Sequence, residues 1–168
     1  ANQAIKKGLI EVDGKVISKP AFNVSSENKI VVLDVMLKYV SWGGMKLERA
    51  INYFNLDFTD KVVLDIGAST GGFTDCALQH GAKCVYAVDV GSNQLDLKLR
   101  ADFRVHSYEN TNICDFDVDV EFDYLVMDVS FVSITKIIPS LLKFLNEDNK
   151  LICLFKPQFE VGKIKMKN

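Results

Sequence analysis

Four charged residues, Asp65, Asp89, Asp128 and Lys156, each stand at the end of a short run of apolar residues. Runs of this kind are typical of buried parallel strands, and open parallel sheets bind their ligands at the carboxyl ends of the strands. Three carboxylates and one ammonium on a single rim would be unusual if they only stabilised the fold. We therefore expect an active site at this rim, where carboxylates can hold hydroxyl groups and a lysine can act as a base.

A glycine-rich turn follows the first of these runs. The chain from Val63 to Asp75 reads as a strand, the turn Gly67–Gly72 and the start of a helix, an arrangement that usually holds a nucleoside-containing cofactor. Ser69 stands where a dinucleotide-binding turn has the glycine that makes room for a pyrophosphate. The pattern DxGxxxGG therefore favours S-adenosylmethionine over NAD, with Asp89 gripping the ribose hydroxyls. A tight turn without a ligand stays open as the alternative.

Length and composition set wide limits. The 168 residues suffice for one domain and a small appendage, and no apolar run approaches the roughly 20 residues of a membrane-spanning helix. The scattered cysteines show no spacing typical of zinc ligands, so we expect no metal site and reduced thiols in a cytoplasmic protein. They are Cys76, Cys84, Cys114 and Cys153.

The charge is distributed unevenly along the chain. The net charge is −2, but residues 1–50 carry +3, residues 51–160 carry −8 and residues 161–168 carry +3. Basic ends around an acidic body favour an RNA partner. An asymmetry this small is more commonly that of an ordinary solvated surface.

The first 34 residues predict a small separate unit. A helix over 2–7 ending at Gly8, a hairpin over 9–17 around the Asp13–Gly14 turn, and a strand over 29–33 bury too little to be stable alone. A linker over 35–44 follows. The helix expected over 45–54 would bury one face formed by Met45, Ala50 and Phe54.

The rest of the chain alternates strands with helices. This order predicts an α/β, Rossmann-like parallel sheet that is covered by helices on both faces. The expected strands are 61–66, 84–89, 103–107, 122–128 and 150–156, and the expected helices are 73–80, 93–101 and 133–145.

Several motifs resemble the hemolysin A (TlyA) family, part of the FtsJ-like ribosomal RNA 2′-O-methyltransferases. They stand in the family's order over residues 39–162, although Trp42 replaces the arginine that is usual there. The motifs are Ser41 to Glu48, Gly67 to Asp75, Ala87 to Gly91, Met127 to Phe131 and Lys156 to Glu160. Residues 1–34 resemble half of an S4-type RNA-binding domain, and the resemblance implies that residues 45–168 are a methyltransferase domain lacking its last strands.

The resemblance also implies roles for residues. Lys46, Asp128 and Lys156 match the first three members of a Lys-Asp-Lys-Glu tetrad, whose fourth member would lie beyond this sequence and is not Glu160. Lys156 would take the proton of a ribose 2′-hydroxyl, and Asp128 would orient Lys156 and the ribose. S-adenosylmethionine would be bound by Asp65, Gly67, Ala68, Ser69, Gly71, Gly72, Phe73, Asp89, Asn112 and Asp128. A core position for Phe73 and a turn position for Asn112 stay open.

The partner implied by the resemblance is ribosomal RNA or a ribosomal subunit, with no membrane involved and the oligomeric state open. One alternative is an RNA-binding or ribosome-associated protein with a vestigial cofactor fold. A binding module has no need of Lys46, Asp128 and Lys156 together, which argues against it. Membrane lysis, which the family's name suggests, needs amphipathic or long apolar segments that this sequence lacks.

Overall fold

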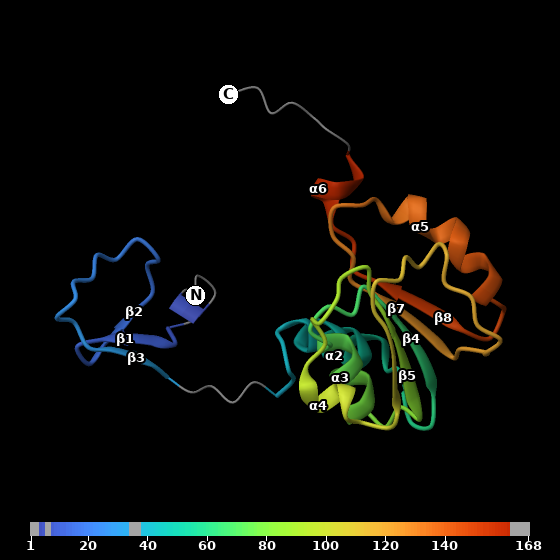
Figure 1. Cartoon of the computed structure of the whole chain (residues 1–168), viewed down its shortest axis with the longest axis horizontal. Helices are drawn as coiled ribbons and strands as arrows, with labels where there is room; N and C mark the ends of the chain where they lie inside the picture. The colour runs from blue at the N-terminus through green and yellow to red at the C-terminus, as the bar shows by residue number, and fades with distance from the viewer. Residues whose placement is uncertain (1–3, 6–7, 34–37, 162–168) are drawn as a thin grey trace. The chain divides into compact units, whose positions relative to one another are not determined.

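The computed structural model describes residues 4–5, 8–33 and 38–161, and the chain divides into two compact units, residues 1–37 and 38–168 (Figure 1). Of the helix predicted over residues 2–7, only residues 4 and 5 are described, and both are helical. The extent of that helix therefore lies outside the described residues.

The N-terminal unit contains an antiparallel sheet in the order β2-β1-β3. Its strands are β1 (Ile10–Val12), β2 (Lys15–Ile17) and β3 (Ile30–Val32), so the predicted hairpin and third strand are confirmed. Asp13 and Gly14 have φ angles of 51° and 77°, the left-handed conformations that a tight hairpin turn requires. Val12 is the one buried side chain among the unit's described residues. The assignment of this unit to an S4-type domain stays a prediction.

The second unit is built on a five-stranded parallel sheet, which confirms the predicted α/β class (Figure 1). The strand order is β6-β5-β4-β7-β8, in which the chain reverses direction across the sheet between β4 and β7. Such a reversal opens a crevice at the strand ends, where α/β sheets bind their ligands. The strands are β4 (Val62–Ile66), β5 (Cys84–Val88), β6 (Val105–Tyr108), β7 (Tyr124–Met127) and β8 (Lys150–Cys153).

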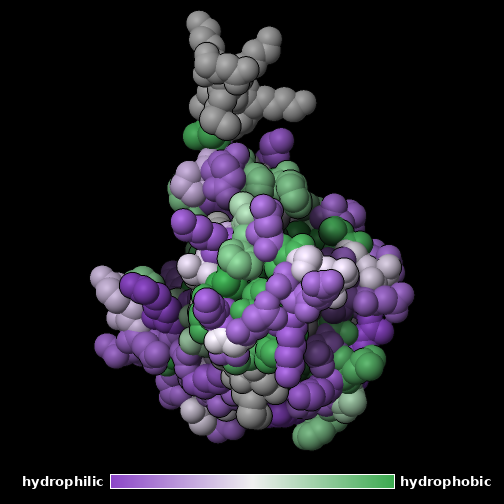
Figure 2. All heavy atoms as spheres, turned by 90° about the vertical axis from the view of Figure 1, so that its left-hand side faces the viewer, coloured by the Kyte–Doolittle hydropathy of each residue, from purple (hydrophilic) through white to green (hydrophobic). Residues whose placement is uncertain are grey.

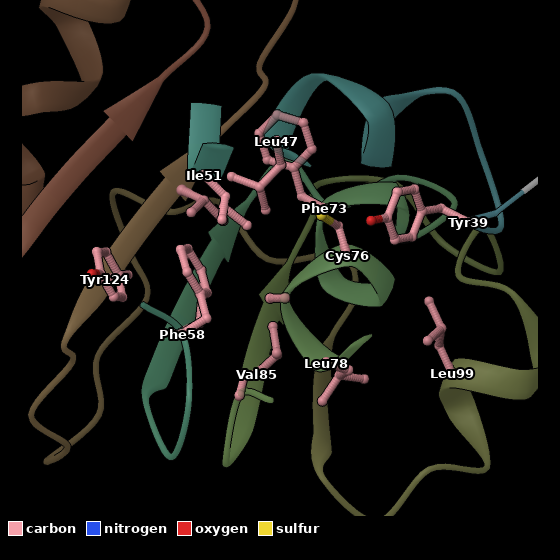
Figure 3. Close-up of a cluster of buried hydrophobic side chains, with 14 of the residues drawn as sticks. Tyr39, Leu47, Ile51, Phe58, Phe73, Cys76, Leu78, Val85, Leu99 and Tyr124 are labelled. Atoms are coloured by element: carbon pink, nitrogen blue, oxygen red, sulfur yellow. The ribbon is translucent and has the colours of Figure 1, made fainter. Parts of the chain in front are cut away.

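Helices flank the sheet on both faces because successive strand residues point to opposite sides. They are α2 (Gly43–Phe54), α3 (Gly72–Gln79), α4 (Leu97–Arg100), α5 (Ile134–Leu141) and α6 (Pro157–Glu160), with a 3-10 turn, η1 (Leu142–Phe144), after α5. Val63 of β4 packs in one core with α2, α3 and α4, whereas Leu64 and Ile66 pack in a second core with α5 and η1. Figure 3 shows the first core, where Phe58 and Tyr124 stack with ring centroids 4.3 Å apart.

The start of the second unit differs from the prediction. Helix α2 begins at Gly43, two residues early, and its buried positions are Gly44, Leu47 and Ile51. The expected buried face was wrong, since Met45 and Phe54 are 42% and 62% exposed. The reason is a close contact: a Cβ on Gly44 would lie 2.4 Å from the ring of Tyr39, so this glycine lets the helix pack.

Tyr39 itself falls in the predicted linker but is only 2% exposed, and it lies in the core beside Cys76 (Figure 3). Asp75 of α3 accepts a hydrogen bond from the Val40 N–H at 2.7 Å, and Gln79 donates one to the Lys38 carbonyl at 2.9 Å. The segment from Lys38 onward is therefore part of the packed second unit.

The outer surface is mixed in character. Figure 2 shows that hydrophilic residues cover most of one face, with apolar residues in smaller patches among them. The most exposed apolar side chains of the second unit include Tyr53, Leu97, Phe103 and Phe131. Scattered apolar residues of this kind are normal on globular proteins, so they alone indicate no interface.

Candidate active site

Asp128 lies between two lysines that come from distant parts of the sequence. The Lys46 ammonium, on helix α2, is 2.7 Å from Oδ2 of Asp128, and the Lys156 ammonium is 2.5 Å from Oδ1. Lys156 also donates a hydrogen bond to Oγ of Ser130 at 2.7 Å. The structure thus brings together the three residues expected to be catalytic.

The carboxylate of Asp128 is stabilised in its charged form. Burial alone would raise the pKa of this carboxyl, but hydrogen bonds and charges from Lys156 and Lys46 outweigh burial and hold the pKa below its usual range. Asp128 is therefore an anion at neutral pH. Its partners are accessible to different degrees, since the side chain of Lys46 is 46% exposed and that of Lys156 only 17%.

A cavity of about 620 Å³ opens beside this group, at the carboxyl ends of the central strands. Its size suits a nucleoside-containing ligand. Residues from three strand ends and from the start of α5 line it. Among the predicted cofactor residues, those that line it are Gly67, Ser69, Asp89, Asn112 and Asp128.

The register of the sheet explains why these residues meet. Ile66 pairs with Val88 on one side and with Met127 on the other, so β4, β5 and β7 end at one level. The next residues, Gly67, Asp89 and Asp128, emerge there together. Gly67 has a φ of +80°, and a Cβ there would lie 3.1 Å from Val129 and 3.3 Å from the Asp128 carbonyl, so the position requires glycine.

Asp89 is oriented by backbone groups. Its Oδ2 accepts a hydrogen bond from the Ser69 N–H at 2.8 Å, and its Oδ1 accepts one from the Gly91 N–H at 2.7 Å. Each carboxylate oxygen has a second acceptor site. Asp89 can therefore hold the glycine-rich turn and still receive two hydroxyl groups from the cavity.

Asn112 takes the turn position that the sequence left open, and its role with the cofactor stays a prediction. Its side-chain oxygen accepts a hydrogen bond from the Cys114 N–H at 3.0 Å, which makes it a turn residue. The same residue lines the cavity. Its oxygen keeps a further lone pair, so an amino group of a ligand can still bind there.

Five predicted cofactor residues do not line the cavity. They are Asp65, Ala68, Gly71, Gly72 and Phe73. Phe73 is 6% exposed and lies in the core against Leu47 (Figure 3). A Cβ on Gly71 would lie 2.2 Å from Leu99, and one on Gly72 would lie 2.3 Å from Ser41, so both glycines serve packing. The packing of Gly71, Gly72 and Phe73 supports the turn from behind, and a cofactor-binding role for the five residues stays a prediction.

Asp65 lies within β4 rather than on the rim, because the strand continues to Ile66. Its side chain is 1% exposed, and Oδ2 accepts a hydrogen bond from the Thr74 hydroxyl at 2.6 Å. Burial raises the pKa of Asp65 to about 7, and the charges of Asp128 and Asp89 add to that rise. Asp65 is therefore a buried carboxyl group behind the site.

Several residues of the site were missed from the sequence. Ser130 accepts a hydrogen bond from Lys156 and lines the cavity. Gln94, Thr111 and Lys136 also line the cavity. Ser130 stands two residues after Asp128 in a motif already recognised, so that motif carried a signal for it. Gln94, Thr111 and Lys136 stand in no motif, and only the folded chain brings them to the cavity.

Over residues 4–5, 8–33 and 38–161, no group of three or more potential ligands is placed to hold a metal ion. Nor does any helix in this described part have the length and apolarity needed to cross a membrane.

Comparisons with known proteins agree with this geometry. The FtsJ-like methyltransferase family matches residues 39–168. Hemolysin A of Brachyspira hyodysenteriae is 47% identical over 164 residues, which are 95% of this chain and 68% of that protein. The 16S/23S rRNA (cytidine-2′-O)-methyltransferase TlyA of Mycobacterium tuberculosis is 40% identical over 167 residues, which are 97% of this chain and 62% of that protein.

The solved structure of a protein from Streptococcus thermophilus that is also named a hemolysin matches with a TM-score of 0.76 and 42% identity. The match covers 96% of this chain and 61% of that protein's chain. The chain thus spans between 61% and 68% of the length of these three relatives. The match over residues 39–168 and the 47% identity to hemolysin A show that the chain belongs to the FtsJ-like methyltransferase family.

Proposed function

We propose that this protein methylates the 2′-hydroxyl of a ribose in ribosomal RNA, with S-adenosylmethionine as the methyl donor. The observation that carries the proposal is the group formed by Lys46, Asp128 and Lys156 at the edge of a nucleoside-sized cavity. A carboxylate with a lowered pKa and specific charged partners at the edge of a cleft is typical of a functional site.

The lining of the cavity fits the cofactor. Asp89 would bind both ribose hydroxyls, since its two oxygens match a vicinal diol and are already aligned by the Ser69 and Gly91 N–H groups. The bare backbone at Gly67 leaves room for the methionine part, and Asn112 would accept the adenine amino group. When bound, S-adenosylmethionine supplies a methyl group whose leaving group is a neutral thioether.

The protein's own residues would do two things, namely align the acceptor hydroxyl and take its proton. Alignment can supply several kcal/mol of the barrier to methyl transfer. Lys156, as a free amine, would accept the proton of the 2′-hydroxyl, while Asp128 and Ser130 fix its direction. Lys46 would keep its charge and balance Asp128 when Lys156 is neutral.

Ribosomal RNA is proposed as the substrate because two features point the same way. A relative 40% identical to this chain is named an rRNA (cytidine-2′-O)-methyltransferase. The chain is basic toward its ends, with +3 over residues 1–50 and +3 over residues 161–168, as suits a protein that binds RNA. The target ribose would lie in a loop or be flipped out, because the hydroxyl of a paired ribose in a stacked helix is hard to bring into a cavity.

The test is methyl transfer from labelled S-adenosylmethionine to bacterial rRNA by the full-length protein. Lys156→Ala is expected to lower the rate by roughly a hundredfold or more, the typical contribution of a positioned base. The matched control is Lys61→Ala, which removes a lysine paired with Asp123 at 3.0 Å outside the cavity. Label must appear on the ribose 2′-oxygen.

Two outcomes would overturn the proposal. If the protein binds S-adenosylmethionine but labels neither rRNA nor ribosomal subunits, the acceptor is another molecule. If it does not bind the cofactor at all, a non-catalytic RNA-binding role becomes the better explanation.

A further inference from the structure

Glu160 makes two contacts that the proposed chemistry does not use. It stands four residues after Lys156 at the end of α6, and it does not line the cavity. Its Oε2 accepts a hydrogen bond from the Ser133 hydroxyl at 2.5 Å, and its Oε1 accepts one from the Ile134 N–H at 3.1 Å. Both partners belong to the start of α5, where the first N–H groups have no acceptor within the helix.

The contacts of Glu160 form a second link between two segments that Lys156 already joins. The loop from Asp128 to Ser133 carries both partners of Lys156, and the segment from Lys156 to Glu160 runs beside it. Lys156 joins them at one end and Glu160 at the other. Between these points the rings of Phe131 and Phe159 lie 5.3 Å apart.

Neither segment is held firmly by regular structure. Strand β8 ends at Cys153, so the sheet does not fix Lys156, and α6 has only four residues with no side-chain cap at its start. In the opposite loop, Phe131 has a φ of 67°, a conformation that non-glycine residues rarely adopt without support from their surroundings. The loop and the lysine segment therefore depend on contacts with each other.

We propose that Glu160 is a positioning residue, which holds the Lys156 amine against Asp128 and Ser130 by tying α6 to the start of α5. Its consequence for catalysis rests on the proposed function, but the positioning itself can be measured without any methyl transfer. What matters is the pair of hydrogen bonds and not the charge of the carboxylate. An amide at this position can accept from the Ile134 N–H and still bond to the Ser133 hydroxyl.

The test compares Glu160→Ala with Glu160→Gln by competitive acetylation, with acetic anhydride as the reagent and mass spectrometry as the readout. The rate at Lys156 is divided by the rate at Lys61, a lysine of the same molecule that is paired elsewhere. In Glu160→Ala this ratio is expected to rise at least about fivefold, because two hydrogen bonds are lost and each is worth a factor of about that size. In Glu160→Gln it should stay at the wild-type value.

Ser133→Ala provides a second variant, which leaves Glu160 in place but removes both the partner hydroxyl and the N-cap of α5, since Ser133 also accepts a hydrogen bond from the Thr135 N–H. Its ratio should also rise, and the double variant Ser133→Ala with Glu160→Ala should rise less than the two single effects multiplied. An unchanged ratio in Glu160→Ala overturns the proposal. So does an equal rise in Glu160→Gln, because the carboxylate charge would then be the cause.

Methyl transfer separates this proposal from the proposed function. If the wild-type protein transfers methyl groups, Glu160→Ala should lower kcat about tenfold or more while the affinity for S-adenosylmethionine stays the same, since Glu160 lies outside the cavity. A rise in Lys156 labelling in a protein without methyl transfer would support the positioning role and contradict the proposed function. Normal methyl transfer with unchanged Lys156 labelling would support the proposed function and contradict the positioning role.

Discussion

Asp65 and Asp128 are both carboxyl groups near the ends of adjacent strands, but their surroundings give them opposite properties. Two lysines keep the pKa of Asp128 low in spite of burial, whereas burial raises the pKa of Asp65 to about 7, with one hydroxyl as its side-chain partner. The apolar runs before the two aspartates do not distinguish them, and only the family motif assigned a catalytic role to Asp128. The distinction depends on Lys46, which is 82 residues from Asp128 in the chain.

The raised pKa of Asp65 predicts a change of stability with pH. In the unfolded chain this group titrates near 3.8 and in the folded protein near 7. Its protonated form therefore favours folding, with a contribution that is complete below about pH 4 and is lost as the pH rises to about 7. Asp65→Asn cannot ionise, so its free energy of unfolding should rise relative to the wild type by up to roughly 1.4 kcal/mol per pH unit across that window.

Urea unfolding at several pH values measures this difference. Asp148→Asn, at an exposed position, serves as the control and should follow the wild type at every pH. A constant difference between Asp65→Asn and the wild type from pH 4 to pH 8 would show that Asp65 does not titrate in this range.

Asp89 gives a second prediction about a single residue. Asp89→Asn replaces one acceptor oxygen by an NH₂ group, which would face the N–H of Ser69 or Gly91. The ribose diol of the cofactor would then lose one of its two acceptors. The affinity for S-adenosylmethionine, measured by calorimetry, should fall by at least about tenfold. Asp102→Asn, which affects a pair with Arg104 outside the cavity, should bind as the wild type does. Unchanged affinity in Asp89→Asn would remove Asp89 from the binding site.

At the level of elements, the sequence predicted the strands better than the helices. A buried parallel strand is a short apolar run, and all five runs became strands of one sheet. The buried face of helix α2 was predicted wrongly because its tightest contact is made by Gly44. Glycine has no side chain, so a pattern of apolar side chains does not include it. Helix α4 covers only Leu97–Arg100 of the expected 93–101, because Asp96 caps it at the Lys98 N–H and begins it late.

In the candidate site, too, sequence patterns do not show which residues meet in the folded chain. Motifs located Lys46, Asp128 and Lys156, and the glycine pattern located the turn. The pattern could not show which turn residues face the cavity, because Gly67 and Gly71 look alike in sequence but meet Val129 and Leu99 respectively. Glu160 stood in a recognised motif, yet its partner Ser133 is 27 residues away and is brought to it by the fold.

Helix α3 holds the segment that precedes α2, and this contact can be tested. Asp75→Ala leaves the half-buried Val40 N–H without its acceptor. It also removes the hydrogen bond that the Gln79 side chain donates to Asp75 at 2.9 Å. The free energy of unfolding in urea should fall by about 1–3 kcal/mol, the cost of an unpaired buried donor. Asp117→Ala breaks an exposed pair with Lys143 and should change it little. Equal effects would show that the contact does not hold the segment.

For the whole molecule, the division at residue 37 predicts where the chain can be cut. A protein of residues 38–168 keeps Tyr39 in the core and should unfold cooperatively at nearly the temperature of the whole chain. A protein of residues 45–168 loses Tyr39 and should be less stable by about 3–5 kcal/mol, as when a large buried aromatic side chain is removed. Calorimetry of both proteins distinguishes them, and equal stability would mean that residues 38–44 add nothing.

The site places two lysines on one carboxylate, whereas residues 51–160, to which Asp128 and Lys156 belong, carry −8 as a whole. A polyanion is repelled by the stretch as a whole and attracted where the lysines lie. Dissolved salt weakens the long-range repulsion before it weakens the attraction at the site. At physiological ionic strength, charges in water are screened beyond about 8 Å, while contacts at bonding distance persist. Adding potassium chloride to a dilute reaction should therefore first speed methyl transfer to RNA and then slow it, whereas binding driven by a uniformly basic surface only weakens as salt is added.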